Sequence, residues 1–134
     1  HGGYELKEAV REHLAHVGHD VTDVGCFSAE SVDYPDFAEQ AVENILSGNS
    51  DLGILICGTG IGMSIAANRH RRIRAANCCD EYTVKMSREH NNANILCLGA
   101  RVLEREDALR MVSVWLDTEF TGGRNQKRIA KFSE

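Results

Sequence analysis

Residues 52–62 read Leu-Gly-Ile-Leu-Ile-Cys-Gly-Thr-Gly-Ile-Gly, and this stretch decides the fold class. Its first half, residues 52–57, is a short apolar run typical of a strand buried on both faces. The second half is a glycine-rich turn, and residues 63–68 after it suit a short helix. A buried strand that leads through a tight turn into a helix is half of a βαβ unit and predicts a parallel sheet.

Outside this stretch, segments with strand and helix periodicity alternate along the chain. Further strands are predicted at residues 21–24, 73–76 and 95–98, and helices at 6–17, 36–46, 80–90, 108–116 and 124–132. This alternation predicts one α/β domain, residues 1–134, with helices on both faces of the sheet. Because His1-Gly2-Gly3 is typical of the exit from an element, we expect one more strand to precede His1.

Composition narrows the class of protein. The 134 residues are 43% hydrophobic and 26% charged, with a net charge of −5, and no apolar run is long enough to cross a bilayer. An acidic chain is a poor non-specific nucleic-acid binder, whereas a small anion held by a few arginines is compatible with it. The number of cysteines is odd, at five, and they include no C-x-x-C pair. We therefore expect free thiols in the cytoplasm and no metal site.

The glycine-rich turn is the strongest candidate for chemistry. Backbone N–H groups at such a turn can hold an oxyanion, and a thiol at Cys57 should be partly thiolate there. That state suits a nucleophile or a base. No lysine completes a Walker A loop, and Met63 stands where a dinucleotide-binding turn has a small residue and where a cysteine phosphatase has arginine. The alternative is a buried cysteine that ends a strand.

Two further segments carry candidate residues. His90 and Asn91 lie between a helix and a strand and could move protons between sugar oxygens and hold hydroxyls, or could simply end the helix. Arg124 and Arg128, after Gly122-Gly123, are one helical turn apart and could grip a phosphate. The alternative there is a solvated basic helix.

Several short segments, spread in order over almost the whole chain, point to a family. They are His1-Gly2-Gly3 with Leu6-Lys7, Asp33-Tyr34-Pro35, residues 56–62, residues 87–91, residues 98–101, and Gly122-Gly123-Arg124 with Arg128. The set resembles the ribose-5-phosphate isomerase B family, which also includes galactose-6-phosphate isomerase subunits. The resemblance implies a Rossmann-like three-layer α/β/α sandwich and a cofactor-free aldose–ketose isomerase of a sugar phosphate. It also implies a homodimer or homotetramer with active sites at the subunit interface.

The resemblance also implies a role for each matching residue. Cys57 matches the base that moves a proton between C1 and C2, and Thr59 matches a hydroxyl beside the reacting oxygen. His90 matches the acid/base that opens the sugar ring, and Asn91 matches a hydroxyl-binding amide. The other implied binding residues are the amides of Gly58, Gly60, Gly62 and Ser64 for the enediolate, Tyr34 in the pocket wall, and His1, Arg124 and Arg128 for the phosphate.

The presence of a cysteine at position 57 helps to choose between possible substrates. Within the resembled family Cys57 favours interconversion of ribose 5-phosphate and ribulose 5-phosphate, a reaction of the pentose phosphate pathway. A six-carbon sugar phosphate, such as allose or galactose 6-phosphate, is the first alternative. A sugar-phosphate-binding module without turnover is the second. Family members have a strand ending in Asp before the position of His1, so the resemblance adds a carboxylate to the expected strand.

Overall fold

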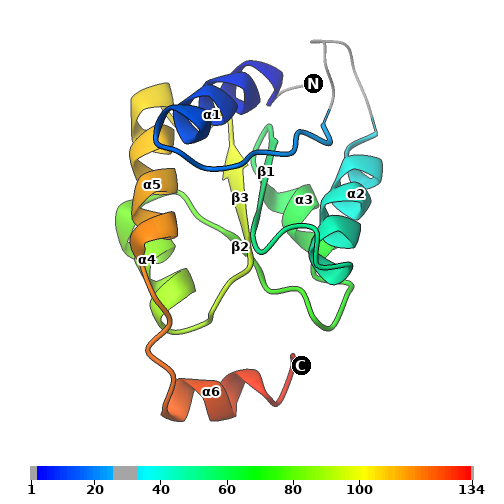
Figure 1. Cartoon of the computed structure of the whole chain (residues 1–134), viewed down its shortest axis with the longest axis vertical. Helices are drawn as coiled ribbons and strands as arrows, with labels where there is room; N and C mark the ends of the chain where they lie inside the picture. The colour runs from blue at the N-terminus through cyan, green and yellow to red at the C-terminus, as the bar shows by residue number, and fades with distance from the viewer. Residues whose placement is uncertain (1–2, 26–32, 134) are drawn as a thin grey trace.

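The structure is a computed structural model that describes residues 3–25 and 33–133, and it is an α/β sandwich (Figure 1). The helices are α1 (Tyr4–His16), α2 (Tyr34–Leu46), α3 (Ile61–Ala67), α4 (Glu81–Glu89), α5 (Arg105–Asp117) and α6 (Arg124–Ile129). The strands are β1 (Gly53–Cys57), β2 (Ala75–Asn77) and β3 (Ile95–Gly99). The prediction of an α/β fold with a parallel sheet is therefore confirmed.

The three strands form one parallel sheet in the order β1-β3-β2. Gly53 pairs with Ile95 and Cys57 with Gly99, so β1 and β3 start and end at the same levels. Every residue of β3 is buried because this strand lies between the other two and is covered by helices on both faces. The sheet therefore has a C-terminal edge, where Cys57, Asn77 and Gly99 lie, and an N-terminal edge, where Gly53 and Ile95 lie.

Apolar side chains form two core clusters, one on each face of the sheet. Figure 1 shows the helices that carry them, with α1, α4 and α5 on one side of the strands and α2 and α3 on the other. On one face, Leu6 and Val10 of α1 and Met111 and Trp115 of α5 pack on the sheet, together with Val84 of α4. On the other face, residues of α2 and α3 do the same; they include Val42, Met63 and Ala67. This packing accounts for the apolar stripes by which the helices are predicted.

Two predicted strands differ from the structure. Residues 21–24 are not a strand: Asp23 is held by Lys7 at 2.6 Å and by the N–H of Gly25 at 3.0 Å, with no ladder beside it. The strand predicted at residues 73–76 is Ala75–Asn77 instead. Ile73 is apolar because it packs in the cluster of α2 and α3, outside the ladder.

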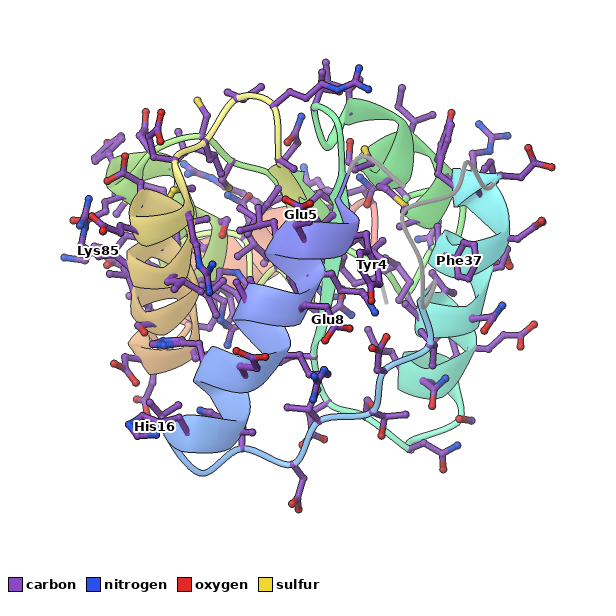
Figure 2. The ribbon with its side chains drawn as sticks, turned by 90° about the horizontal axis from the view of Figure 1, so that it is seen from above. Tyr4, Glu5, Glu8, His16, Phe37 and Lys85 are labelled. Atoms are coloured by element: carbon purple, nitrogen blue, oxygen red, sulfur yellow. The ribbon has the colours of Figure 1, made fainter. Side chains whose placement is uncertain are left out.

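Within the described residues β1 pairs with β3 only, and its other side borders a cavity of about 500 Å³. The wall of this cavity includes residues of α1, α2 and β1 and residues 19–25. Figure 2 views the molecule from above and labels two wall residues, Tyr4 of α1 and Phe37 of α2, on either side of it. Gly3 fits against β1 because it has no side chain: a Cβ there would lie 2.6 Å from the Ile56 carbonyl oxygen.

The sequence-based predictions at His1 lie outside the described residues, and the strand expected before it stays a prediction. None of the helices in the described part of the chain is long and apolar enough to cross a bilayer.

Candidate active site

The turn between β1 and α3 holds the Cys57 sulfur against backbone. Gly60 has a φ of 87°, a left-handed conformation that glycine adopts without strain. The chain therefore doubles back, and the Gly60 N–H donates to Cys57 Sγ at 3.1 Å. The Thr59 hydroxyl accepts from the Ile61 N–H at 3.2 Å. The Cys57 sulfur is thus half-buried and accepts a backbone N–H, and its role as a base or nucleophile stays a prediction.

Tyr34 and Ser64 lie on the same turn. A Cβ on Gly62 would lie 2.7 Å from the Tyr34 hydroxyl oxygen, so the tyrosine ring rests on this glycine and closes one side of the turn. Tyr34 is still 43% exposed. The Ser64 hydroxyl donates to the Ile61 carbonyl at 2.8 Å, inside its own helix. The structure thus brings together the candidate residues of this turn. They are Cys57, Thr59, Tyr34, Ser64 and the glycines Gly58, Gly60 and Gly62.

Arg101 belongs to the same place, although the sequence analysis gives it no role. The segment after β3 is joined to the turn by two bonds, from the Ala100 N–H to the Cys57 carbonyl at 2.8 Å and from the Arg101 N–H to the Gly58 carbonyl at 3.0 Å. The Arg101 side chain runs beside Gly58, 3.5 Å from where a Cβ would lie. Its position two residues after a strand that ends at the ligand-binding edge points to this cation from the sequence alone.

His90 and Asn91 lie where α4 ends and the chain turns into β3. His90 is the C-cap of α4, about half exposed, with Nε2 3.9 Å from Glu89 Oε1. The Asn91 side chain is 3.5 Å from the Met86 carbonyl. Asn92, with a φ of 45°, adopts the left-handed conformation that asparagine tolerates at the end of a helix.

The helix α6 lies at the same end of the sheet as His90. The Thr121 N–H ahead of it donates to the Glu89 carbonyl at 3.0 Å, and the Ser133 hydroxyl after it donates to the Arg71 carbonyl at 2.7 Å. Figure 1 shows α6 below the sheet, away from the turn after β1. Arg124 and Arg128 are exposed on a helix that is shorter than the predicted 124–132.

The candidate residues therefore fall into two groups at opposite edges of the sheet. Cys57 is level with Gly99, whereas His90 and Asn91 precede Ile95, which is level with Gly53. Four strand residues at about 3.3 Å each put roughly 13 Å between the two levels. A shared catalytic role predicts that the Cys57 thiol and the ring-opening His90 lie at one sheet edge. Within a single chain this prediction is wrong, because a helix after a parallel strand returns the chain to the opposite edge.

The described residues contain no group of three or more His, Cys, Asp or Glu side chains arranged to hold a metal ion. Burial raises the pKa of the Cys97 and Cys78 thiols above the ordinary value, so at neutral pH these two are neutral core residues. In the described residues, Cys57 is the cysteine whose sulfur accepts a hydrogen bond from a backbone N–H, that of Gly60.

Comparison with known proteins gives consistent matches over the whole chain. The profile of a family described as "Ribose/Galactose Isomerase" matches residues 1–132. A putative sugar phosphate isomerase of Bacillus subtilis is 47% identical over 100% of this chain and 91% of its own length. Ribose-5-phosphate isomerase B of Escherichia coli is 44% identical over 96% of this chain and 87% of its own length.

Solved structures agree with these sequence matches. A ribose 5-phosphate isomerase of Thermotoga maritima has a TM-score of 0.96 and 51% identity, covering 98% of this chain and 91% of that one. Ribose-5-phosphate isomerase B of Mycoplasma genitalium, solved with bound ribulose-5-phosphate, has a TM-score of 0.92 and 39% identity, covering 97% and 87%.

Proposed function

The chain belongs to the ribose/galactose isomerase family, and on that premise we propose that it interconverts ribose 5-phosphate and ribulose 5-phosphate. The observation that carries the proposal is the N–H of Gly60 at 3.1 Å from the Cys57 sulfur, at the edge of the sheet where ligands bind. The relative solved with ribulose-5-phosphate supports the choice of substrate. Action in the cytoplasm, in the pentose phosphate pathway, is part of the same proposal.

The proposed chemistry is a proton transfer through an enediolate. The Cys57 thiolate removes the proton from C2 of the open-chain aldose, and the electron pair moves through C1 to the carbonyl oxygen. The resulting thiol returns the proton to C1. The proton of the O2 hydroxyl passes to O1, so that O2 becomes the ketone oxygen and O1 becomes a hydroxyl. The Thr59 hydroxyl lies beside the sulfur in sequence and can exchange a proton with these oxygens, while turn N–H groups stabilise the negative charge.

The phosphate and ring-opening groups come, in this proposal, from a second copy of the chain. His90, Asn91, Arg124 and Arg128 lie at the edge of the sheet away from Cys57, and this supports a site assembled across a subunit interface. The exposure of Ile61 and Ile65, at 53% and 62%, also supports it, because these large apolar residues flank the turn. Arg101, on the Cys57 side, would meet the phosphate or enediolate from its own subunit.

The test of the function is direct. The protein is incubated with ribose 5-phosphate, and ribulose 5-phosphate is measured, with allose 6-phosphate and galactose 6-phosphate assayed in parallel. Rapid turnover of ribose 5-phosphate alone is the expected result. Preference for a six-carbon substrate would replace it with the sister reaction. Binding without turnover of any of the three would make the protein a sugar-phosphate sensor.

Arg124→Ala and Arg128→Ala should each weaken sugar-phosphate binding roughly 10- to 100-fold, because a charge-assisted hydrogen bond contributes about 1.5–3 kcal/mol. The dissociation constants for ribose 5-phosphate and for an unphosphorylated analogue are measured by calorimetry. Lys127→Ala and Lys131→Ala, which remove neighbouring cations, are the matched controls and should have little effect. Equal losses for both ligands would make the arginines structural.

A further inference from the structure

The peptide unit between Thr59 and Gly60 is held at both of its polar ends. Its N–H is the group that donates to Cys57 Sγ at 3.1 Å. In a planar trans peptide the carbonyl points the opposite way, so the Thr59 oxygen is directed away from the sulfur. It is directed toward β3: a Cβ on Gly99 would lie 2.6 Å from it, which leaves room only for glycine at that position.

The side chain of Asn77 meets this carbonyl from the far side of β3. Asn77 ends β2, where it pairs with Cys97. One side of its amide faces two backbone carbonyl oxygens, so the amide nitrogen is the atom that satisfies them, donating to Cys97 at 3.2 Å and to Thr59 at 3.3 Å. The turn therefore arches over the end of β3 and rests on β2. A Cβ added to Gly60 would lie 2.5 Å from the same Asn77 amide, so the turn and this amide are in close contact.

We propose that Asn77 is a positioning residue for Cys57, acting through the Thr59–Gly60 peptide, and this rests on the proposed isomerase function. Asn77 touches no reacting atom. By holding the Thr59 carbonyl it opposes rotation of the peptide about its two flanking bonds, the motion that would turn the Gly60 N–H away from the sulfur. Without the amide donor, the peptide loses its fixed orientation, and the sulfur loses the hydrogen bond that favours thiolate.

The proposal is tested on the free protein with two variants. Asn77→Leu removes the donor without adding charge, and Asn77→Asp keeps the size of the side chain and offers only oxygens to the two carbonyls. The rate at which iodoacetamide alkylates Cys57 is followed across pH, with the modified cysteine located by tandem mass spectrometry. In both variants we expect the rate at neutral pH to fall about tenfold, as for one lost hydrogen bond to a charged group, and the profile to shift to higher pH.

Asn68→Ala is the matched control. Asn68 also holds β2 in place, because its side chain exchanges two hydrogen bonds with the backbone of Ala75, at 2.9 and 2.7 Å, rather than with the Thr59 carbonyl. It should lower the melting temperature and leave the alkylation profile of Cys57 unchanged. If Asn77→Leu fails to fold, the Asp variant still decides the question.

Kinetics with ribose 5-phosphate add a second readout. In the Asn77 variants kcat should fall while KM stays the same, because the amide acts on the base, Cys57, and not on the substrate. An unchanged alkylation profile in a folded Asn77 variant overturns the proposal, and a raised KM with that unchanged profile would make Asn77 a substrate contact instead. If the wild-type protein does not turn over ribose 5-phosphate, the proposed function fails, and the alkylation profile still tests the effect of Asn77 on the sulfur.

Discussion

Cys57→Ala is expected to abolish isomerisation while sugar-phosphate binding survives. The sulfur is the only group of the turn that can accept and return a proton at carbon in the proposed mechanism, and general acid–base groups of this kind contribute roughly 10²–10⁴-fold to rate. The Gly60 N–H and the rest of the turn remain, so the ligand still binds. We therefore expect kcat and kcat/KM to fall together, measured by ribulose 5-phosphate formation, with an unchanged dissociation constant from calorimetry.

Cys79→Ala is the control for this variant. Cys79 is an exposed free thiol just beyond β2, and no role is assigned to it. It should keep full activity, which separates the loss of the base from the loss of any thiol near the C-terminal edge. Near wild-type turnover in Cys57→Ala would contradict the assignment of the base.

The strand-turn-helix unit at residues 52–62 could be predicted because its signals are local. A continuous apolar run, a glycine with positive φ and a helix start all lie within eleven residues. The failure at residues 21–24 has the opposite cause. An apolar, β-branched segment indicates that the residues suit a strand, but a strand exists only where a neighbour supplies the ladder. The carboxylate of Asp23, inside that segment, instead accepts hydrogen bonds from Lys7 and from the Gly25 N–H.

The candidate site shows the same division between local and long-range information. The Cys57 turn can be predicted because its N–H donors belong to adjacent residues. Asn77 cannot be found this way, because its amide contacts backbone carbonyls of two other segments. Every residue has a backbone carbonyl, so the sequence does not show which ones are contacted. The sheet edge at which His90 lies does follow from parallel topology. The residues just before a strand and the residues just after it lie at opposite edges of the sheet.

The proposed site shared between two subunits gives the second large expected effect. Cys57→Ala and His90→Ala should each be nearly inactive alone, yet a mixture in which subunits reassociate should regain activity. In a dimer, a mixed pair has one site with both replacements and one with neither. Random pairing makes half of the dimers mixed, so the mixture should recover about a quarter of wild-type activity. The activity is measured after co-expression of the two variants with different tags and isolation of the doubly tagged dimer, which should then carry about half of the wild-type rate.

The control mixes two variants from the same edge of the sheet, Cys57→Ala and Thr59→Ala. Both residues lie on the turn after β1, so every site of a mixed dimer carries one of the two replacements and none is intact. No activity beyond that of the separate variants should return. Recovery in this control to the same degree, or no recovery with His90→Ala while mixed dimers are present, would show that Cys57 and His90 do not meet across a subunit interface. The roughly 13 Å between their levels in one chain would then have to close by movement within that chain.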